Sequence, residues 1–209
     1  MKTKKDSAKY YGERVDKLRG LDTNLDDCIS EFQKILENHK KKITAYDTFL
    51  KELSVDSFKK VKSEVMKLEG MFDEDELANE SERRYIVKIE NILNEMMKNE
   101  ENTELSQMEK DTTQDLKELF RMIESIKPMW ERQLEFMKQD DDYKLSKAGI
   151  KELTDIFKEE SNLLKIEESL LKKIDLKTGN ILRKTTLKLR ELEKTKDMNM
   201  RYREIRHIR

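Results

Sequence analysis

The chain has 209 residues, of which 43% are charged and 35% are hydrophobic, whereas globular domains average about 25% and about 45–50%. That balance excludes a thick globular core, and apolar residues that recur at helical spacing exclude a disordered chain. The formal net charge of −1 gives the chain as a whole no electrostatic attraction to nucleic acid. Long helices with one buried stripe and a large solvated face satisfy these limits.

A heptad pattern predicts the first helix, over roughly residues 6–70. An a series starts at Leu18 and a d series at Leu21, with Lys42 as the misfit at d, and an e series starting at Ile29 widens the stripe. A stripe of this width predicts contacts with two or more neighbouring helices. The predicted helix-packing interface consists of Leu18, Leu21, Leu25, Phe32, Ile35, Tyr46, Phe49 and Leu53.

Two features interrupt this pattern. The register slips at residues 54–57, where polar capping residues cluster and predict a kink or a short break. Gly70 is a candidate helix end, and the acidic run 73–76 favours a new helix start through capping and the helix dipole. We therefore expect the second helical region to begin near residue 75.

The second region is predicted to run from about 75 to 138. Residues 98–104 contain no apolar side chain. They could form a hairpin turn with Asn102 or Thr103 as the N-cap, or a solvated stretch of one continuous helix. The lack of Gly or Pro favours continuity. Pro128 removes a backbone hydrogen bond and should bend the helix near Lys127.

The last helix is predicted over about 147–200, after an acidic loop at 139–142 and with Ser146 as its N-cap. Gly179 lies inside it and weakens it by about 1 kcal/mol relative to alanine. A basic tail, 201–209, follows. The fold expected from these elements is all-α: one domain over residues 1–209, built as an elongated antiparallel bundle of about three long, kinked, coiled-coil-like helices.

The residue inventory leaves little for catalysis. His39 and His207 are the two histidines, too few for a histidine-based metal site or a catalytic triad. Glu204 and His207 match the E-x-x-H spacing of di-iron bundles, but those sites need two such motifs and two further glutamates. We expect no enzyme activity, no catalytic or metal-binding residue, no cofactor and no small-molecule substrate.

Two core positions carry polar atoms that allow two interpretations each. His39, at an a position, either helps to set the helix register or forms a pH-sensitive contact. Cys28, at a d position, is either a small buried hydrophobe or a nucleophile, and no partner histidine supports the second interpretation. A single cysteine also indicates a reducing compartment. With no signal-peptide core and no long apolar run, we expect a cytoplasmic location.

The charges are unevenly spread: residues 71–118 hold fifteen acids and six bases, whereas residues 181–209 hold ten bases and four acids. Dense arginines can bind phosphate groups, although cations near a helix C-terminus also simply complement its dipole. The candidate polyanion-binding residues are Arg183, Lys184, Arg201, Arg203, Arg206 and Arg209.

Our leading interpretation is a non-enzymatic scaffold or adaptor that acts through coiled-coil contacts with a protein partner and forms a homodimer. As an alternative, three long helices with a register slip near 54–57 and a proline bend at Pro128 resemble the layout of BAR-domain proteins. That resemblance implies a crescent-shaped dimer that binds an anionic membrane surface. The expected tip, residues 140–142, is however acidic, where that family would place basic residues. A further alternative is nucleic-acid binding through the Arg-rich C-terminus, which lacks a groove-reading motif.

Overall fold

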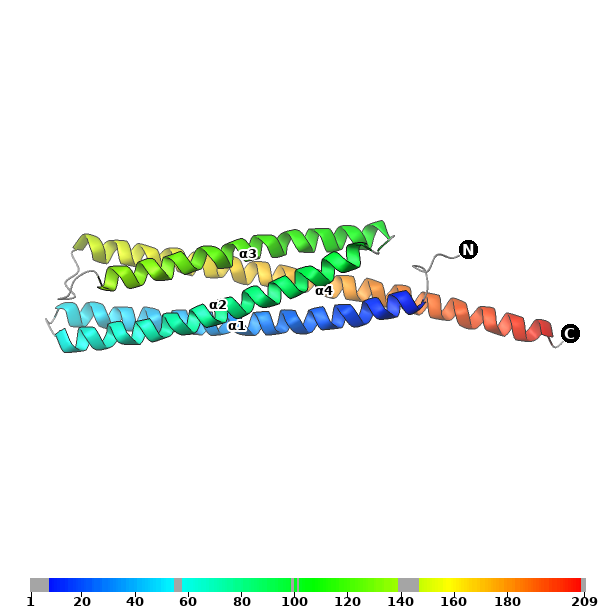
Figure 1. Cartoon of the computed structure of the whole chain (residues 1–209), viewed down its shortest axis with the longest axis horizontal. Helices are drawn as coiled ribbons and strands as arrows, with labels where there is room; N and C mark the ends of the chain where they lie inside the picture. The colour runs from blue at the N-terminus through cyan, green and yellow to red at the C-terminus, as the bar shows by residue number, and fades with distance from the viewer. Residues whose placement is uncertain (1–7, 55–57, 99, 101, 139–146, 208–209) are drawn as a thin grey trace. The chain divides into compact units, whose positions relative to one another are not determined.

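The computed structural model describes the backbone of residues 8–54, 58–98, 100, 102–138 and 147–207, and the side chains of these residues except 52–54, 58–62, 137–138, 147 and 199–207. Within these ranges the chain forms a helical bundle and no strand (Figure 1). The helices are α1 (Ala8–Ser54), α2 (Phe58–Lys98), α3 (Thr103–Lys138) and α4 (Lys147–His207). The predicted all-α class is confirmed, with four helices in place of about three.

The chain divides into two compact units, and each unit contains a piece of every helix. Unit 1 consists of Met1–Leu25, Val87–Leu116 and Lys172–Arg209, and unit 2 consists of Asp26–Ile86 and Lys117–Leu171. The prediction of one elongated domain over residues 1–209 stays a prediction.

Unit 2 has a core built from one apolar stripe of each helix. The stripes follow the 3-4 spacing that places side chains on one helix face. Polar and charged side chains interrupt the stripes at several fully buried positions, which include Lys42, Asp75, Glu82, Glu160 and Glu167. The buried apolar residues of this core include Cys28, Phe32, Ile35, Phe49, Leu68, Phe72, Leu119, Ile123, Leu153 and Leu164.

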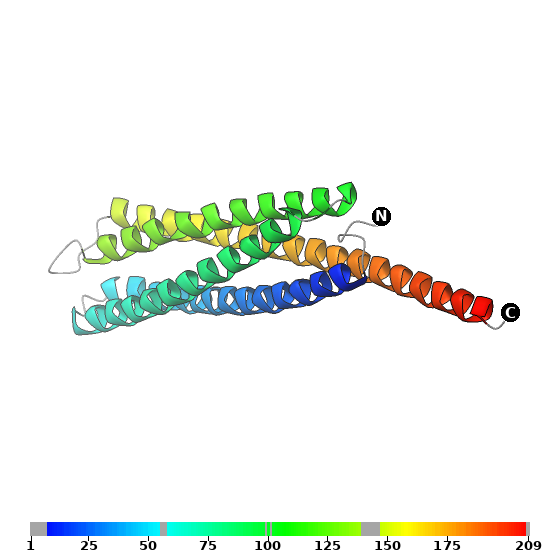
Figure 2. The same cartoon turned by 45° about the vertical axis from the view of Figure 1, so that its right-hand side comes forward.

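Unit 1 has its own core, to which α4 contributes only part of its length. Thr185 is the last buried residue among the α4 side chains described up to Met198, whereas the helix continues to His207. Within unit 1, this final part of α4 extends past the start of α1 and past the turn between α2 and α3 (Figures 1 and 2). The buried apolar residues of this core include Tyr11, Val15, Leu18, Leu21, Leu25, Ile89, Leu93, Met96, Leu105, Ile174 and Ile181.

The predicted helix end at Gly70 is wrong, because α2 runs without a break from Phe58 to Lys98. Gly70 is exposed, and a side chain added there would meet open space. A glycine in such a place costs the helix only about 1 kcal/mol, which the buried neighbours Leu68 and Phe72 offset. The break predicted at residues 54–57 agrees with the end of α1 at Ser54 and the start of α2 at Phe58, and residues 55–57 lie outside the described part of the chain.

The prediction of one continuous helix through residues 98–104 is also wrong. The helix α2 ends at Lys98, and α3 begins at Thr103. The side chain of Asn102 accepts hydrogen bonds from the backbone N–H groups of Glu104 (3.0 Å) and Leu105 (3.3 Å). Asn102 is therefore the N-cap of α3, because it satisfies two of the amide groups that a helix start leaves unpaired.

Two further expectations concern α3 and the segment after it. The helix α3 continues through the exposed Pro128 to Lys138, and the bend expected near Lys127 stays a prediction. The predicted loop at 139–142 and the predicted cap at Ser146 lie outside the described residues.

Candidate functional site

The most heavily charged site inside unit 2 centres on Lys42, which is fully buried. Its Nζ lies 2.6 Å from Glu160 Oε1 and 2.7 Å from Asp75 Oδ2. The same ammonium lies 4.5 Å from the ring centre of Phe72 and 5.1 Å from that of Trp130. Two carboxylates and two aromatic faces together replace the water that Lys42 loses on burial. We call Lys42, Asp75, Trp130, Gln133, Glu160 and His39 the Lys42 network.

Glu160 collects most of the hydrogen bonds in this network. Its Oε1 accepts from Lys42 and from Trp130 Nε1 (2.8 Å), and its Oε2 accepts from Gln133 Nε2 (2.8 Å). Burial by itself would raise the pKa of Glu160, but the contact with His39 and the charge of Lys42 outweigh it and lower that pKa to about 2. Glu160 is therefore a carboxylate at neutral pH, although no part of it reaches solvent.

His39 lies at the edge of the same network and contacts α4 through both ring nitrogens. Its Nε2 lies 2.7 Å from Ser161 Oγ, and its Nδ1 lies 3.2 Å from Glu160 Oε1. These contacts fix one position of α1 against one position of α4. The geometry thus fits the interpretation of His39 as a residue that helps to set the helix register.

A second buried cluster in unit 2 contains no cation among the residues that the structure describes. Glu82 of α2 and Glu167 of α4 are both fully buried. Among the described residues, none of their four carboxyl oxygens has a hydrogen-bond partner. Burial raises the pKa of Glu167 to about 8. Burial also raises the pKa of Glu82, and the charges of Glu167 and Glu31 add to the effect. We call Glu82 and Glu167 the carboxyl pair.

Cys28 of α1 lies beside the carboxyl pair, with its Sγ 4.0 Å from the backbone oxygen of Glu82. Burial raises the pKa of the Cys28 thiol well above its ordinary range, and the nearby Glu82 and Glu167 raise it further. A thiol that cannot ionise is a poor nucleophile. The geometry therefore fits the interpretation of Cys28 as a small core residue.

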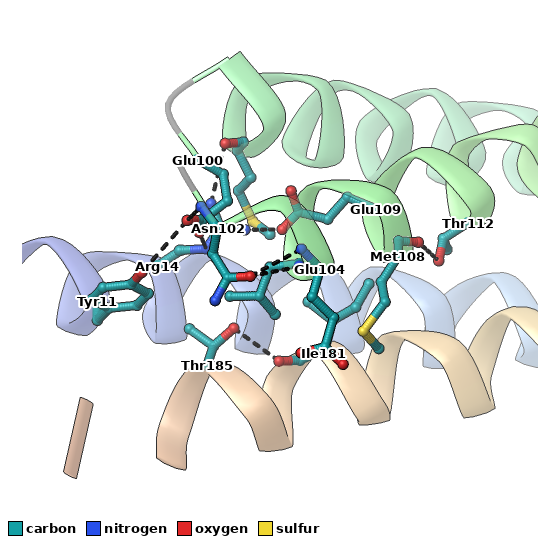
Figure 3. Close-up of polar contacts among 12 residues, drawn as sticks. Tyr11, Arg14, Glu100, Asn102, Glu104, Met108, Glu109, Thr112, Ile181 and Thr185 are labelled. Atoms are coloured by element: carbon teal, nitrogen blue, oxygen red, sulfur yellow. Dashed lines mark hydrogen bonds and ion pairs between the residues drawn. The ribbon is translucent and has the colours of Figure 1, made fainter. Parts of the chain in front are cut away.

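In unit 1, a buried arginine holds the turn between α2 and α3 (Figure 3). Arg14 Nε lies 3.1 Å from Glu100 Oε2, and Arg14 Nη1 donates to the backbone oxygen of Met96 at 3.1 Å. Arg14 Nη2 also pairs with Glu109. Glu100 in turn accepts a hydrogen bond from the backbone N–H of Asn102 at 2.7 Å. Arg14 thus connects α1 to the end of α2 and to the start of α3.

The side chains of these clusters lie inside the helix cores and are buried from solvent. Across the described residues, no group of three or more His, Cys, Asp or Glu side chains is arranged to hold a metal ion. What the clusters can do is to select one alignment of the four helices, because a shifted alignment would leave buried charges unpaired.

The structure places the predicted site residues in two different settings. Of the predicted helix-packing residues, those from Leu18 to Phe49 are buried inside the chain's own cores, and the side chain of Leu53 lies outside the described part. Among the candidate polyanion-binding residues, Arg183 is exposed and Lys184 pairs with Glu104. The side chains of Arg201, Arg203 and Arg206 lie outside the described residues, as does Arg209 altogether.

Sequence reasoning missed the partners of Lys42 and the whole carboxyl pair. A signal for them existed, because each acidic residue occupies a core position of its own stripe. Glu160 and Glu167 stand three residues after Phe157 and Leu164, respectively, and Asp75 stands three residues after Phe72. Polar residues at such positions identify buried groups, and tertiary contacts decide which of these groups meet.

Comparisons of this chain with protein-family models, with curated proteins and with solved structures find no match. In the described part of the chain, each helix is too polar to span a lipid bilayer.

Proposed function

We propose that this chain is a non-enzymatic helical scaffold or adaptor that acts through helix–helix contacts and self-associates as a homodimer. One observation carries the proposal. Among the side chains of α4 that the structure describes, which end at Met198, the last buried one is Thr185, and the helix nevertheless continues to His207. A lone helical segment of this length is marginal in water, and a partner helix would stabilise it.

The side chains of this final segment support the proposal. Leu187 and Met198 are 51% and 56% exposed, respectively, and Leu189 and Leu192 are half-buried. An apolar side chain gains about 25 cal/mol per Å² when it leaves water. We name residues 186–207 the α4 extension and propose that it docks on another protein.

We also propose that the helices of unit 2 pack in the antiparallel, coiled-coil-like manner expected from the sequence. Contacts between α1 and α2 support this arrangement, since Cys28 contacts Glu82 whereas Asn38, further along α1, contacts Glu74, earlier in α2. Short connections between neighbouring helices favour the same arrangement. The buried single thiol of Cys28 fits the reducing cytoplasm, which stays our proposed location.

A test of the proposal compares the full chain with a variant truncated after Thr186, by light scattering and analytical ultracentrifugation over a range of concentrations. We expect the full chain to form dimers and the truncated variant to remain monomeric while keeping its helical circular dichroism per residue. A full chain that stays monomeric at every concentration would contradict the self-association.

A second candidate function, binding of a polyanion, rests on the exposed cations Arg183, Arg190 and Lys194. Each could contribute about 1 kcal/mol near an anionic membrane, and the attraction would fade within a Debye length of about 10 Å at 0.1 M salt. Sedimentation with phosphatidylserine vesicles, or with duplex RNA, at about 50 mM salt tests the membrane and nucleic-acid alternatives. Binding to neither would leave the scaffold as the sole proposal.

A further inference from the structure

The outward face of α4 in unit 1 carries a line of exposed apolar residues. Leu176, Leu187 and Met198 are 68%, 51% and 56% exposed, respectively, and they follow each other at intervals of eleven residues. Eleven residues make about three helical turns, so that these side chains lie on one face of the helix. The core residues Ile174 and Ile181 project from the opposite face. The helix α4 therefore has an outward apolar line in addition to its buried stripe.

Cations stand between these apolar residues. Arg183 precedes Leu187 by four residues, and Arg190 follows it by three, which places all three on the same face. Both arginines are exposed, and so is Lys194 one turn further along. Glu191 follows Leu187 by four residues and is exposed on the other side of that leucine, so that the face carries one acid beside its three cations. We name Leu176, Arg183, Leu187, Arg190, Lys194 and Met198 the basic stripe.

The outward face of α2 in unit 2 has the same geometry with the opposite charge. Met66 and Leu77 are 61% and 67% exposed, respectively, and they too are eleven residues apart. Asp73 precedes Leu77 by four residues and Glu80 follows it by three, and both acids are exposed. We name Met66, Asp73, Leu77 and Glu80 the acidic stripe.

From this match we infer that the basic stripe of one copy of the chain docks on the acidic stripe of a second copy, with Leu187 against Leu77. The inference deepens the proposed function and rests on it, because it names the partner of the α4 face. When the two helices run antiparallel, Asp73 and Glu80, which flank Leu77, meet Arg190 and Arg183, respectively, which flank Leu187 at the same spacings. In parallel helices the acids and the arginines would lie on opposite sides of the leucine contact, because both charges of each helix lie on the same side of its leucine. The inferred contact is therefore antiparallel. Arg84 stands seven residues after Leu77 on the same face and pairs with Glu80 at 3.2 Å, so that the acidic stripe has a cation at its C-terminal end.

Charge complementarity favours contact between a basic stripe and an acidic stripe over contact between two stripes of the same charge. Two basic stripes would bring arginines together, and two acidic stripes would bring carboxylates together, and each arrangement is repulsive. Only the mixed pair covers exposed leucines and neutralises charge at once. Ion pairs at a surface are screened by salt, so the association should weaken as the ionic strength rises.

A charge-swap experiment tests the inference on the full chain. One variant carries Arg183→Glu and Arg190→Glu, and another carries Asp73→Lys and Glu80→Lys. All four positions are exposed, so that circular dichroism and thermal unfolding should stay close to those of the unaltered chain. By sedimentation velocity at about 50 mM salt, each variant alone should lose self-association, with at least a tenfold rise in the dissociation constant. A 1:1 mixture of the two variants should associate again, because each altered stripe then meets a complementary one.

The control variant carries Lys40→Glu and Lys41→Glu, a charge reversal of equal size on the exposed face of α1, and it should associate like the unaltered chain. Self-association that survives both stripe variants would overturn the inference and leave the proposed scaffold intact. A chain that is monomeric throughout would overturn both. Binding of phosphatidylserine vesicles that Arg183→Glu and Arg190→Glu abolish, in a chain that does not self-associate, would assign the basic stripe to a membrane and overturn its assignment to a second copy.

Discussion

Two glutamates on α4, Glu160 and Glu167, share a helix face, a unit and complete burial, and yet they differ in their protonation. They stand seven residues apart, about two helical turns. The pKa of Glu160 is about 2, whereas that of Glu167 is about 8. Loss of water penalises the charge on both. The difference comes from the neighbours, because the contact with His39 and the charge of Lys42 lower the pKa of Glu160, whereas burial alone acts on Glu167 and raises its pKa.

This difference teaches that burial alone does not fix the charge of a core residue. Desolvation of an ionised carboxyl group costs several kcal/mol, and a well-placed cation with further hydrogen bonds can offset that cost. Without a cation, the group keeps its proton instead. The Lys42 network is therefore a charged core, and the carboxyl pair is a largely neutral one, within the same unit.

The largest effect is expected from removing the cation. Lys42→Met keeps the apolar stem but leaves Asp75 and Glu160 buried without an ammonium, and it should lower the free energy of unfolding by about 3–5 kcal/mol in urea titrations. The neighbouring exposed Lys41, which pairs with Glu37 at 3.1 Å, provides the control, since Lys41→Met should change the stability by less than about 0.5 kcal/mol. Equal effects of the two substitutions would show that the ammonium of Lys42 does not offset the cost of burying Asp75 and Glu160.

The dependence of stability on pH should separate the two glutamates. Glu167 has a folded pKa of about 8 against an ordinary 4.5, so its contribution is complete below about pH 4.5. That contribution is lost as the pH rises to about 8, at about 1.4 kcal/mol per pH unit. Glu160 has a folded pKa of about 2 against an ordinary 4.5, so its contribution is present above pH 4.5 and is lost as the pH falls toward 2. The measurement is the free energy of unfolding in urea from pH 3 to pH 9.

Glutamine variants show which glutamate causes the loss of stability at acid pH and which causes the loss as the pH rises to about 8. Glu167→Gln should reduce the loss above about pH 4.5, of which Glu82 with its own raised pKa keeps a part, and should stabilise the protein at pH 8. Glu160→Gln should flatten the acid limb and should destabilise the protein at neutral pH, because Lys42 then keeps only Asp75 as an anionic partner. The same substitution would thus act with opposite sign at two positions of one helix. Effects of the same sign at pH 8 would refute the contrast between the two sites.

The smallest effect is expected at Cys28. Its thiol should react with a water-soluble disulfide reagent at pH 8 only as fast as the protein unfolds, because burial is the first cause of its raised pKa. The double variant Glu82→Gln and Glu167→Gln removes two of the three carboxyl groups that raise this pKa further, leaves Glu31, and should raise the labelling rate only slightly. A large increase would mean that the carboxyl pair, and not burial, protects the thiol. The labelling rate in urea supplies the reference for the unfolded chain.

The helical class and much of the first helix could be predicted because periodicity is a local property of the sequence. The a and d positions from Leu18 to Phe49 are buried in the folded chain, whereas the e residue Ile43 is 39% exposed. The stripe on α1 is thus narrower than its apolar residues indicate. The break near 54–57 was also readable, from the change of register.

The turn at residues 98–104 and the charged cores could not be predicted in the same way. Asn102 serves as an N-cap, but Asn occurs in many other settings, and the buried Arg14 that secures the turn stands more than eighty residues earlier. Lys42 was visible as a misfit, yet its partners are on other helices. Glu160 and Glu167 show the same local sequence pattern, but the pKa of Glu160 is lowered and that of Glu167 is raised. The alignment of the helices decides which neighbours each of them meets.

The two units are completed at different points of the sequence, which sets the order in which they can fold during synthesis. Unit 2 needs residues up to Leu171, so that its last segment leaves the ribosome before the final piece of unit 1, which starts at Lys172. Domains generally begin to fold as their residues emerge. The first turns of α1, which include Arg14, are therefore synthesised long before Ile181 and its neighbours, which complete the core of unit 1. A nascent chain from which residues up to Leu171 had left the ribosome could hold an assembled unit 2 while the first segment of unit 1 still lacked its last partner.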